Sequence, residues 1–142
     1  MIYADASFLV SLYLPDANST AAARAMRAAK QPIVLTILGE LEVLNALGMR
    51  VYRNEASPME AHVSLANFNK DLREGALRPR PLPEQVFERA RHLSEQTTAR
   101  LGTGATDLLH VAAALEMGAE SLYSFDKQQR KLAQVVRLKV NR

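Results

Sequence analysis

The chain has 142 residues, of which 48% are hydrophobic and 23% charged, and its formal net charge at pH 7 is +3. This length and composition predict a single folded domain over residues 1–142 and exclude a disordered protein. Because cysteine is absent, disulfide frameworks, thiolate metal sites and cysteine catalysis are excluded, and the cytoplasm is the expected compartment.

Apolar runs and turn residues predict alternating strands and helices over the first half of the chain. The segment MIYADASFLVSLYL has no basic leader, and Asp5 interrupts its apolar stretch, so it is typical of neither a signal peptide nor a membrane span. The predicted elements are a strand at 2–4, a helix from Ser7 to the break at Pro15, an Ala-rich helix at 18–30, a strand at 33–35, and helices at 37–53 and 58–73. The third helix is predicted to carry one apolar stripe, formed by Ile37, Leu41, Leu44, Leu47, Gly48 and Val51.

Proline and glycine divide the second half of the chain in the same way. The predicted elements are a short or edge strand within the proline-rich segment 78–83, helices at 84–100 and 105–118, a strand at 121–125, a helix at 127–134 and a last strand at 135–140. Strands and helices alternate, which predicts an α/β fold with a mostly parallel sheet of four or five strands and helices on both faces.

Acidic residues follow two of the predicted strands and lie on two of the predicted helices, near the place where such a fold binds ligands. In parallel α/β sheets, ligands bind outside the carboxyl ends of the strands, near the point where the strand order reverses. Asp5 ends the first predicted strand and Asp126 follows the strand SLYSF, so both are expected at this edge. Asp107 begins a helix after a pair of glycines, and the third predicted helix carries Glu40 and Glu42. Four carboxylates are therefore expected to converge.

Grouped carboxylates repel one another unless a cation holds them together, and hard divalent ions such as Mg²⁺ and Mn²⁺ prefer oxygen ligands. Such ions can polarise a phosphodiester, lower the pKa of a bound water and neutralise the leaving oxygen. The pattern thus predicts metal-dependent hydrolysis without a covalent intermediate.

Each acid also has a purely structural interpretation. Asp5 and Asp126 are suited to cap the helices that follow them, and Asp107 to a first helical turn favoured by the helix dipole. It is the combination of the four positions that favours a functional site.

Neighbouring polar residues leave alternatives open. Glu40 and Glu42 point about 200° apart on a helix, so only one of them is expected to line the site, and helical geometry does not choose between them. Ser7 could hydrogen-bond a metal-bound water or cap the helix, and we include it in the candidate site. His110 shares a helix face with Asp107, but a lone histidine on an apolar helix is more often a packed core residue, and we leave it out of the catalytic set.

The charge distribution is compatible with a polyanionic partner. After Asp126 the chain carries six basic residues and no acidic ones, although such a run is often only a solvated surface. No phosphate-binding glycine loop and no dinucleotide fingerprint is present, so a nucleotide cofactor is not expected.

Three segments, DASFLVSLYLPD, LTILGELEVLNAL and ATDLLHVAAALEMGAESLYSFDKQQRKLA, together resemble the PIN domain, particularly the toxin of type II (VapBC-like) toxin–antitoxin pairs. The resemblance spans nearly the whole chain, and its last segment is the most specific. It implies a Rossmann-like α/β/α sandwich and Mg²⁺- or Mn²⁺-dependent cleavage of single-stranded or structured RNA that inhibits translation and growth. It also implies a homodimer and a small antitoxin partner that enters the acidic groove.

The roles of the family's metal-binding acids pass to Asp5, Asp107 and Asp126. The family pattern L-T-x-L-x-x-L-E-x-x-N-A-L aligns its glutamate with Glu42, whereas Glu40 fits a spacing found in some relatives. We therefore predict Glu42 as the fourth ligand.

Two other functions are compatible with an aspartate after the first strand or with a PIN-like fold. A phosphotransferase of the haloacid dehalogenase type needs a second aspartate two residues after the first, and Ser7 occupies that position. A PIN-like module without catalysis, binding RNA or protein, is the main alternative, and the retained set of four acids argues against it.

Overall fold

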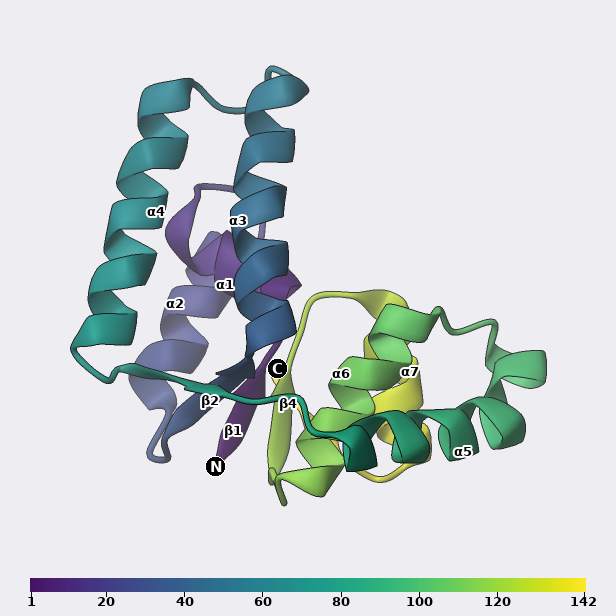
Figure 1. Cartoon of the computed structure of the whole chain (residues 1–142). Helices are drawn as coiled ribbons and strands as arrows, with labels where there is room; N and C mark the ends of the chain where they lie inside the picture. Colours follow the sequence, from purple (N-terminus) through teal and green to yellow (C-terminus); the bar gives the residue numbers. More distant parts are fainter.

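The computed structural model describes residues 1–142, in which strands and helices alternate along nearly the whole chain (Figure 1). The elements in chain order are β1 (Ile2–Ala4), α1 (Ala6–Tyr13), α2 (Ser19–Ala28), β2 (Ile33–Thr36), α3 (Ile37–Tyr52), α4 (Pro58–Arg73), β3 (Leu77–Arg80), α5 (Glu84–Leu101), α6 (Ala105–Glu116), β4 (Ser121–Tyr123), α7 (Lys127–Val135) and β5 (Lys139–Val140). The α/β class is confirmed, and so are all the predicted helices, with boundaries that differ by a few residues.

The five strands form one sheet in the order β3-β2-β1-β4-β5, and every neighbouring pair is parallel. The chain builds outward from β1 to β2 and β3, then returns to add β4 on the other side of β1. The strand order therefore reverses between β1 and β4, and the carboxyl ends of these two strands flank the position where α/β folds bind ligands.

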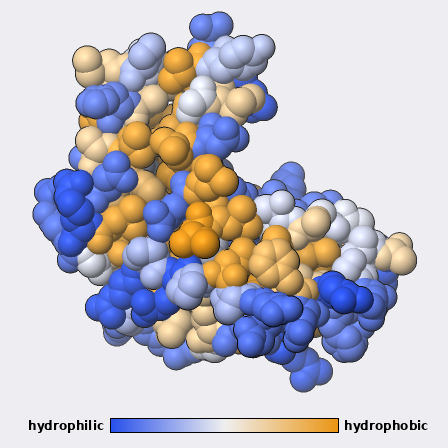
Figure 2. Space-filling view, viewed as in Figure 1, coloured by the Kyte–Doolittle hydropathy of each residue, from blue (hydrophilic) through white to orange (hydrophobic).

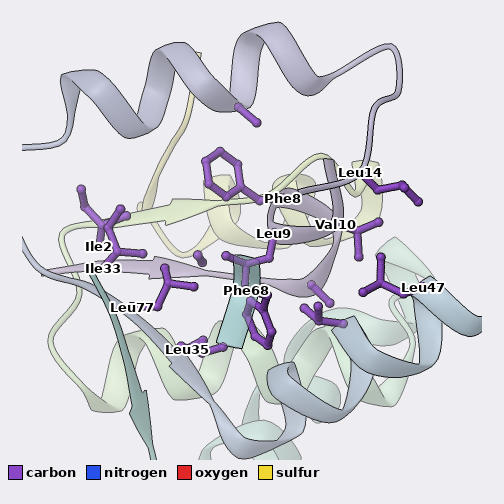
Figure 3. Packing of buried hydrophobic residues seen from close by; sticks show 14 residues of the cluster. Ile2, Phe8, Leu9, Val10, Leu14, Ile33, Leu35, Leu47, Phe68 and Leu77 are labelled. Carbon is purple, nitrogen blue, oxygen red and sulfur yellow. The ribbon is translucent and has the colours of Figure 1, made fainter. Parts of the chain in front are cut away.

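Helices cover both faces of the sheet and enclose two separate hydrophobic cores. Successive side chains of a strand point to opposite faces, so Ile2 and Ala4 belong to the core under α1, α3 and α4, whereas Tyr3 belongs to the core under α5, α6 and α7. Figure 3 shows the first core, in which Phe8 and Phe68 pack among aliphatic side chains from the strands and helices.

Local signals in the sequence explain where several helices begin and end. Ser57 and Glu60 form a reciprocal capping box at the start of α4, with Pro58 at the first helical position. Gly102 and Gly118 follow α5 and α6 with φ angles of 67° and 66°, a left-handed conformation that glycine adopts without steric cost.

The prediction that the apolar stripe of α3 faces the core is wrong. The helix buries Gly39, Val43 and Leu47, whereas Leu41 and Leu44 are 62% and 50% exposed. Helix α3 has apolar residues on two faces, and the position of its neighbours α1 and α4, which periodicity cannot reveal, decides which face is buried. The exposed face contributes to the hydrophobic surface along the angle between the two groups of helices (Figure 2).

The last predicted strand is also shorter than expected. Val135 belongs to α7, and Arg137 turns the chain with a φ angle of 62°. Only Lys139 and Val140 pair with β4, because packing of Leu132 and Ala133 in the second core extends the helix across a segment with strand propensity. None of the helices is long and apolar enough to cross a membrane.

Candidate active site

Asp5 lies at the carboxyl end of β1 and caps α1. Its carboxylate accepts hydrogen bonds from the backbone N–H of Phe8 at 2.9 Å, from Ser7 Oγ at 2.7 Å and from Ser124 Oγ at 2.6 Å. The residue is 1% exposed. Burial raises the pKa of Asp5, although the three hydrogen bonds oppose this shift. The capping role is therefore present, and it holds a buried carboxylate in one orientation.

Ser7 and Ser124 tie the start of α1 to the loop after β4. The backbone N–H of Phe125 donates to Ser7 Oγ at 2.9 Å, and that of Asp126 donates to Ser124 Oγ at 3.0 Å. The two hydroxyl oxygens lie 3.3 Å apart. Because both serines also bond Asp5, these contacts fix the positions of Asp5 and Asp126 relative to each other.

Asp107 and Asp126 lie on the side of the sheet covered by α6 and α7. Asp126 caps α7 and accepts the backbone N–H groups of Gln128 and Gln129. The amide nitrogen Nε2 of Gln129 donates to Asp107 Oδ1 at 3.1 Å. Burial raises the pKa of Asp107, the nearby carboxylates of Asp126 and Glu42 raise it further, and the bond from Gln129 opposes the shift. These three acids therefore share one electrostatic environment.

Glu42 reaches the same region from α3. Its Oε1 is hydrogen-bonded to Nε2 of His110, a residue on α6 that is 1% exposed. The other ring nitrogen of His110 lies 2.7 Å from the hydroxyl of Tyr3, in the centre of the sheet. Glu40 lies on a different face of α3 and does not contact this group, so Glu42 is the glutamate that the fold brings to His110.

A polar cleft adjoins these acids between α1 and α3. It consists of two neighbouring cavities of about 330 Å³ and 310 Å³. Ser7 and Asp126 line the first, Glu42 lines the second, and Arg50 lines both. Arg50 is paired with Asp16 at 3.2 Å. Of the four acids, Asp126 and Glu42 are therefore open to a ligand in the cleft, whereas Asp5 and Asp107 do not line it.

The clamp formed by Arg130 and Asn141 supports the loop after β4. Arg130 donates to the backbone oxygen of Ser124 at 2.8 Å and to Oδ1 and the backbone oxygen of Asn141 at 3.1 and 2.9 Å. The backbone N–H of Ser124 also donates to Asn141 Oδ1 at 2.8 Å. This clamp joins the edge strand β5 to the residue that bonds Asp5.

The donor set fits a divalent cation in its chemistry but does not form a complete cage. No three His, Cys, Asp or Glu side chains are grouped closely enough to hold an ion. Mg²⁺ commonly keeps several waters and binds only one or two carboxylates directly, so a water-rich complex is compatible with this arrangement. Beside Asp107, the buried oxygen Oε1 of Gln129 has no hydrogen-bond partner and could accept a hydrogen from such a water.

The five predicted site residues divide into two groups in the structure. Asp5, Ser7 and Asp126 are linked through the loop after β4, whereas Glu42 and Asp107 approach from α3 and α6. Sequence reasoning missed three supporting residues, Tyr3, Ser124 and Gln129. The sole signal in the sequence was the segment FDKQQ, which places a glutamine three residues after Asp126.

The chain matches the profile of a protein family over most of its length. The profile of a family described as PIN domain matches residues 2–135, which is nearly the whole chain. No curated protein sequence matches.

Several solved structures share the fold at low sequence identity. VapC20 from Mycobacterium tuberculosis, described as a sarcin-ricin loop cleaving toxin, is 18% identical with a TM-score of 0.72, and the alignment covers 92% of this chain and 94% of that one. FitAcB from Neisseria gonorrhoeae is 14% identical with a TM-score of 0.71, over 100% and 97% of the two chains. A toxin–antitoxin complex from Klebsiella pneumoniae is 14% identical with a TM-score of 0.61, over 91% and 89%. These similarities confirm the α/β fold.

Proposed function

The chain belongs to the PIN domain family, and on this premise we propose that residues 1–142 form a single domain that is a metal-dependent endoribonuclease. Its substrate would be single-stranded or structured RNA, and its role that of the toxin in a toxin–antitoxin pair. What supports the proposal is the position of Asp5 and Asp126 after β1 and β4, where the strand order reverses, together with the electrostatic influence of Asp126 and Glu42 on Asp107.

The similar structures support the biological part of this proposal. One is described as a toxin that cleaves the sarcin-ricin loop and another as a toxin–antitoxin complex. We extend from them an RNA substrate and an antitoxin partner. The homodimer stays a prediction from the family resemblance. The cytoplasmic location stays a prediction from the sequence.

Asp5, Glu42, Asp107 and Asp126 would hold Mg²⁺ or Mn²⁺. When bound, the ion would polarise the phosphodiester and make a bound water more acidic. The chain contributes orientation: Ser7 and Ser124 fix Asp5, and Gln129 fixes Asp107. Ser7 Oγ donates its hydrogen to Asp5 and accepts one from Phe125, so it is held as a positioning group and is not free to act as a nucleophile.

The test is cleavage of a labelled single-stranded RNA, with tRNA and rRNA as further substrates, in Mn²⁺ or Mg²⁺ and in EDTA. We expect cleavage by the wild type only with metal and its loss in Asp5→Asn, Asp107→Asn and Glu42→Gln. Glu40→Gln is the matched control, because it removes the same charge from the same helix two residues away, and it should stay active.

Two results would refute the proposal. Equal cleavage by wild type and the Asp5→Asn variant would identify the activity as a contaminant. If every RNA in the panel stays intact in Mn²⁺ and in Mg²⁺, the binding module without catalysis becomes the better interpretation.

A further inference from the structure

A chain of buried hydrogen bonds crosses the centre of the molecule and ends on Glu42. It begins at Thr36, which caps α3 by accepting the backbone N–H of Gly39 at 3.2 Å. Thr36 Oγ1 lies 3.2 Å from the hydroxyl of Tyr3, and that hydroxyl lies 2.7 Å from Nδ1 of His110. Nε2 of His110 then bonds Glu42 Oε1. Thr36 and Tyr3 are 0% exposed and His110 is 1% exposed.

The number of hydrogens available restricts how this chain can be arranged. A carboxylate only accepts, so Nε2 of His110 must carry the hydrogen that it shares with Glu42. In the neutral ring Nδ1 is then an acceptor, and it takes the hydrogen of the Tyr3 hydroxyl. The Tyr3 oxygen in turn accepts the hydrogen of the Thr36 hydroxyl. In this arrangement Thr36, Tyr3 and His110 each donate one hydrogen, and each donates it to the next group along the chain toward Glu42.

The two oxygens of Glu42 have different surroundings. Oε1 is held by His110, whereas Oε2 accepts no hydrogen bond from the chain. The Glu42 side chain is 32% exposed and lines the cleft, while the His110 side chain is buried behind it. The contact therefore fixes one oxygen from inside the protein and leaves the other open to a ligand.

We propose that His110 is a positioning residue that orients Glu42 toward the metal, and that the ring of His110 is itself set by Tyr3 and Thr36. This rests on the proposed function, in which Glu42 is a metal ligand. Partners that hydrogen-bond a ligating side chain orient it, and their loss typically weakens metal binding by about 10- to 100-fold. A histidine that served only to fill the core would not affect metal affinity in a variant that still folds.

Mn²⁺ affinity of the whole chain is the direct test, measured by the loss of the free-ion signal in electron paramagnetic resonance. Tyr3→Phe removes only the hydroxyl, and His110→Leu removes the donor to Glu42. We expect Mn²⁺ affinity to fall by about 10- to 100-fold in His110→Leu and by less in Tyr3→Phe. His110→Gln, which can still donate to Glu42, should restore part of the loss.

Activity measured against Mn²⁺ concentration provides a second readout. RNA cleavage by His110→Leu should approach the wild-type rate at saturating Mn²⁺, because the defect lies in holding the ion. Nitrogen-15 spectra of the wild type should show the hydrogen on Nε2 of His110, and in Tyr3→Phe the signal of Nδ1 should shift because its donor is gone. Circular dichroism confirms that each variant is folded before it is compared.

Glu42→Gln distinguishes a failure of the proposed metal site from a failure of the positioning role alone. If it leaves Mn²⁺ affinity unchanged, Glu42 is not a ligand, and both the proposed metal site and this inference are overturned. If Glu42→Gln weakens binding while folded His110→Leu and Tyr3→Phe bind Mn²⁺ like the wild type, the positioning role alone is overturned. Glu40→Gln should leave the affinity unchanged.

Discussion

Replacing Asp5 by asparagine should make the protein more stable at neutral pH while abolishing cleavage. Asparagine has the same shape and can keep the network: its Oδ1 accepts from Phe8 and Ser7, and its amide donates to Ser124. The hydroxyl of Ser124 then turns to Ser7 Oγ, which lies 3.3 Å away. The variant therefore removes a buried charge and keeps each former partner of Asp5 bonded, while the second amide hydrogen of the asparagine gains no partner.

The size of the gain follows from two opposing effects. Hydrogen bonds to a charged acceptor are stronger than those to a neutral one, each by roughly 1 kcal/mol. Burial of the ionised group works against them, and because the pKa of Asp5 is raised, burial is the larger effect. Because burying a charge costs several kcal/mol, and the weaker hydrogen bonds and the unpaired amide hydrogen offset most of this, we expect a gain on the order of 1 kcal/mol at pH 7.

The pH dependence of the free energy of unfolding tests this prediction. A carboxyl whose folded pKa is raised binds more protons in the folded state, so wild-type stability falls as pH rises above the unfolded value of about 3.9. The advantage of Asp5→Asn should hence be small at pH 4 and grow toward neutral pH in urea unfolding with EDTA. An equal advantage at both pH values, or a loss of stability at pH 7, would contradict the reasoning.

Asp16→Asn is the matched control with the opposite sign. Burial would raise the pKa of Asp16, but hydrogen bonds from Ser11 and the backbone of Asn18, with the charge of Arg50, lower it below its ordinary value. The carboxylate then contributes stability above the unfolded pKa that is lost as pH falls. Asp16→Asn should cost about 0.5–1 kcal/mol at pH 7 and less near pH 4.

Three further changes test the support of the loop after β4, the packing of the first core and the helix propensity of α3. Arg130→Ala removes the bonds to Ser124 and Asn141 and should cost about 2–3 kcal/mol, with faster amide hydrogen exchange at Ser124; unchanged exchange would show that the clamp is unimportant. Phe68→Ala empties a buried position in the first core and should cost about 3–5 kcal/mol, measured by urea unfolding. Gly48→Ala should raise stability by up to about 1 kcal/mol, because its Cβ meets no atom within 4 Å in α3; a lower melting temperature would disagree.

The order of alternating strands and helices could be predicted from the sequence, and with it the class of fold. Two neighbouring parallel strands need a connection that crosses over one face of the sheet, and this connection usually contains a helix. The helix is visible in the sequence as a periodic apolar segment, so the alternation of strands and helices predicts a parallel sheet. The buried face of α3 was not predictable from periodicity, since Val43 and Leu41 both fit an apolar stripe and only α1 and α4 distinguish them.

The candidate site, like the fold, could be predicted only in part. Asp5 and Asp126 were predictable because they follow strands, and parallel strands end at one edge. Their supporting contacts were not, because partners such as Asp5 and Ser124 are 119 residues apart. His110 illustrates the limit: it is a packed core residue, as its apolar helix indicates, and it also holds Glu42.

The central place of β1 has a consequence for synthesis of the protein. Asp5 is made almost at once, but Ser124, its partner at 2.6 Å, is 119 residues later. At about 5–20 residues per second, roughly 6–24 s of translation separate the two. Nascent chains that end before β4 therefore lack the assembled acidic site, and a ribosome that makes this protein carries no completed nuclease until the last strands are translated.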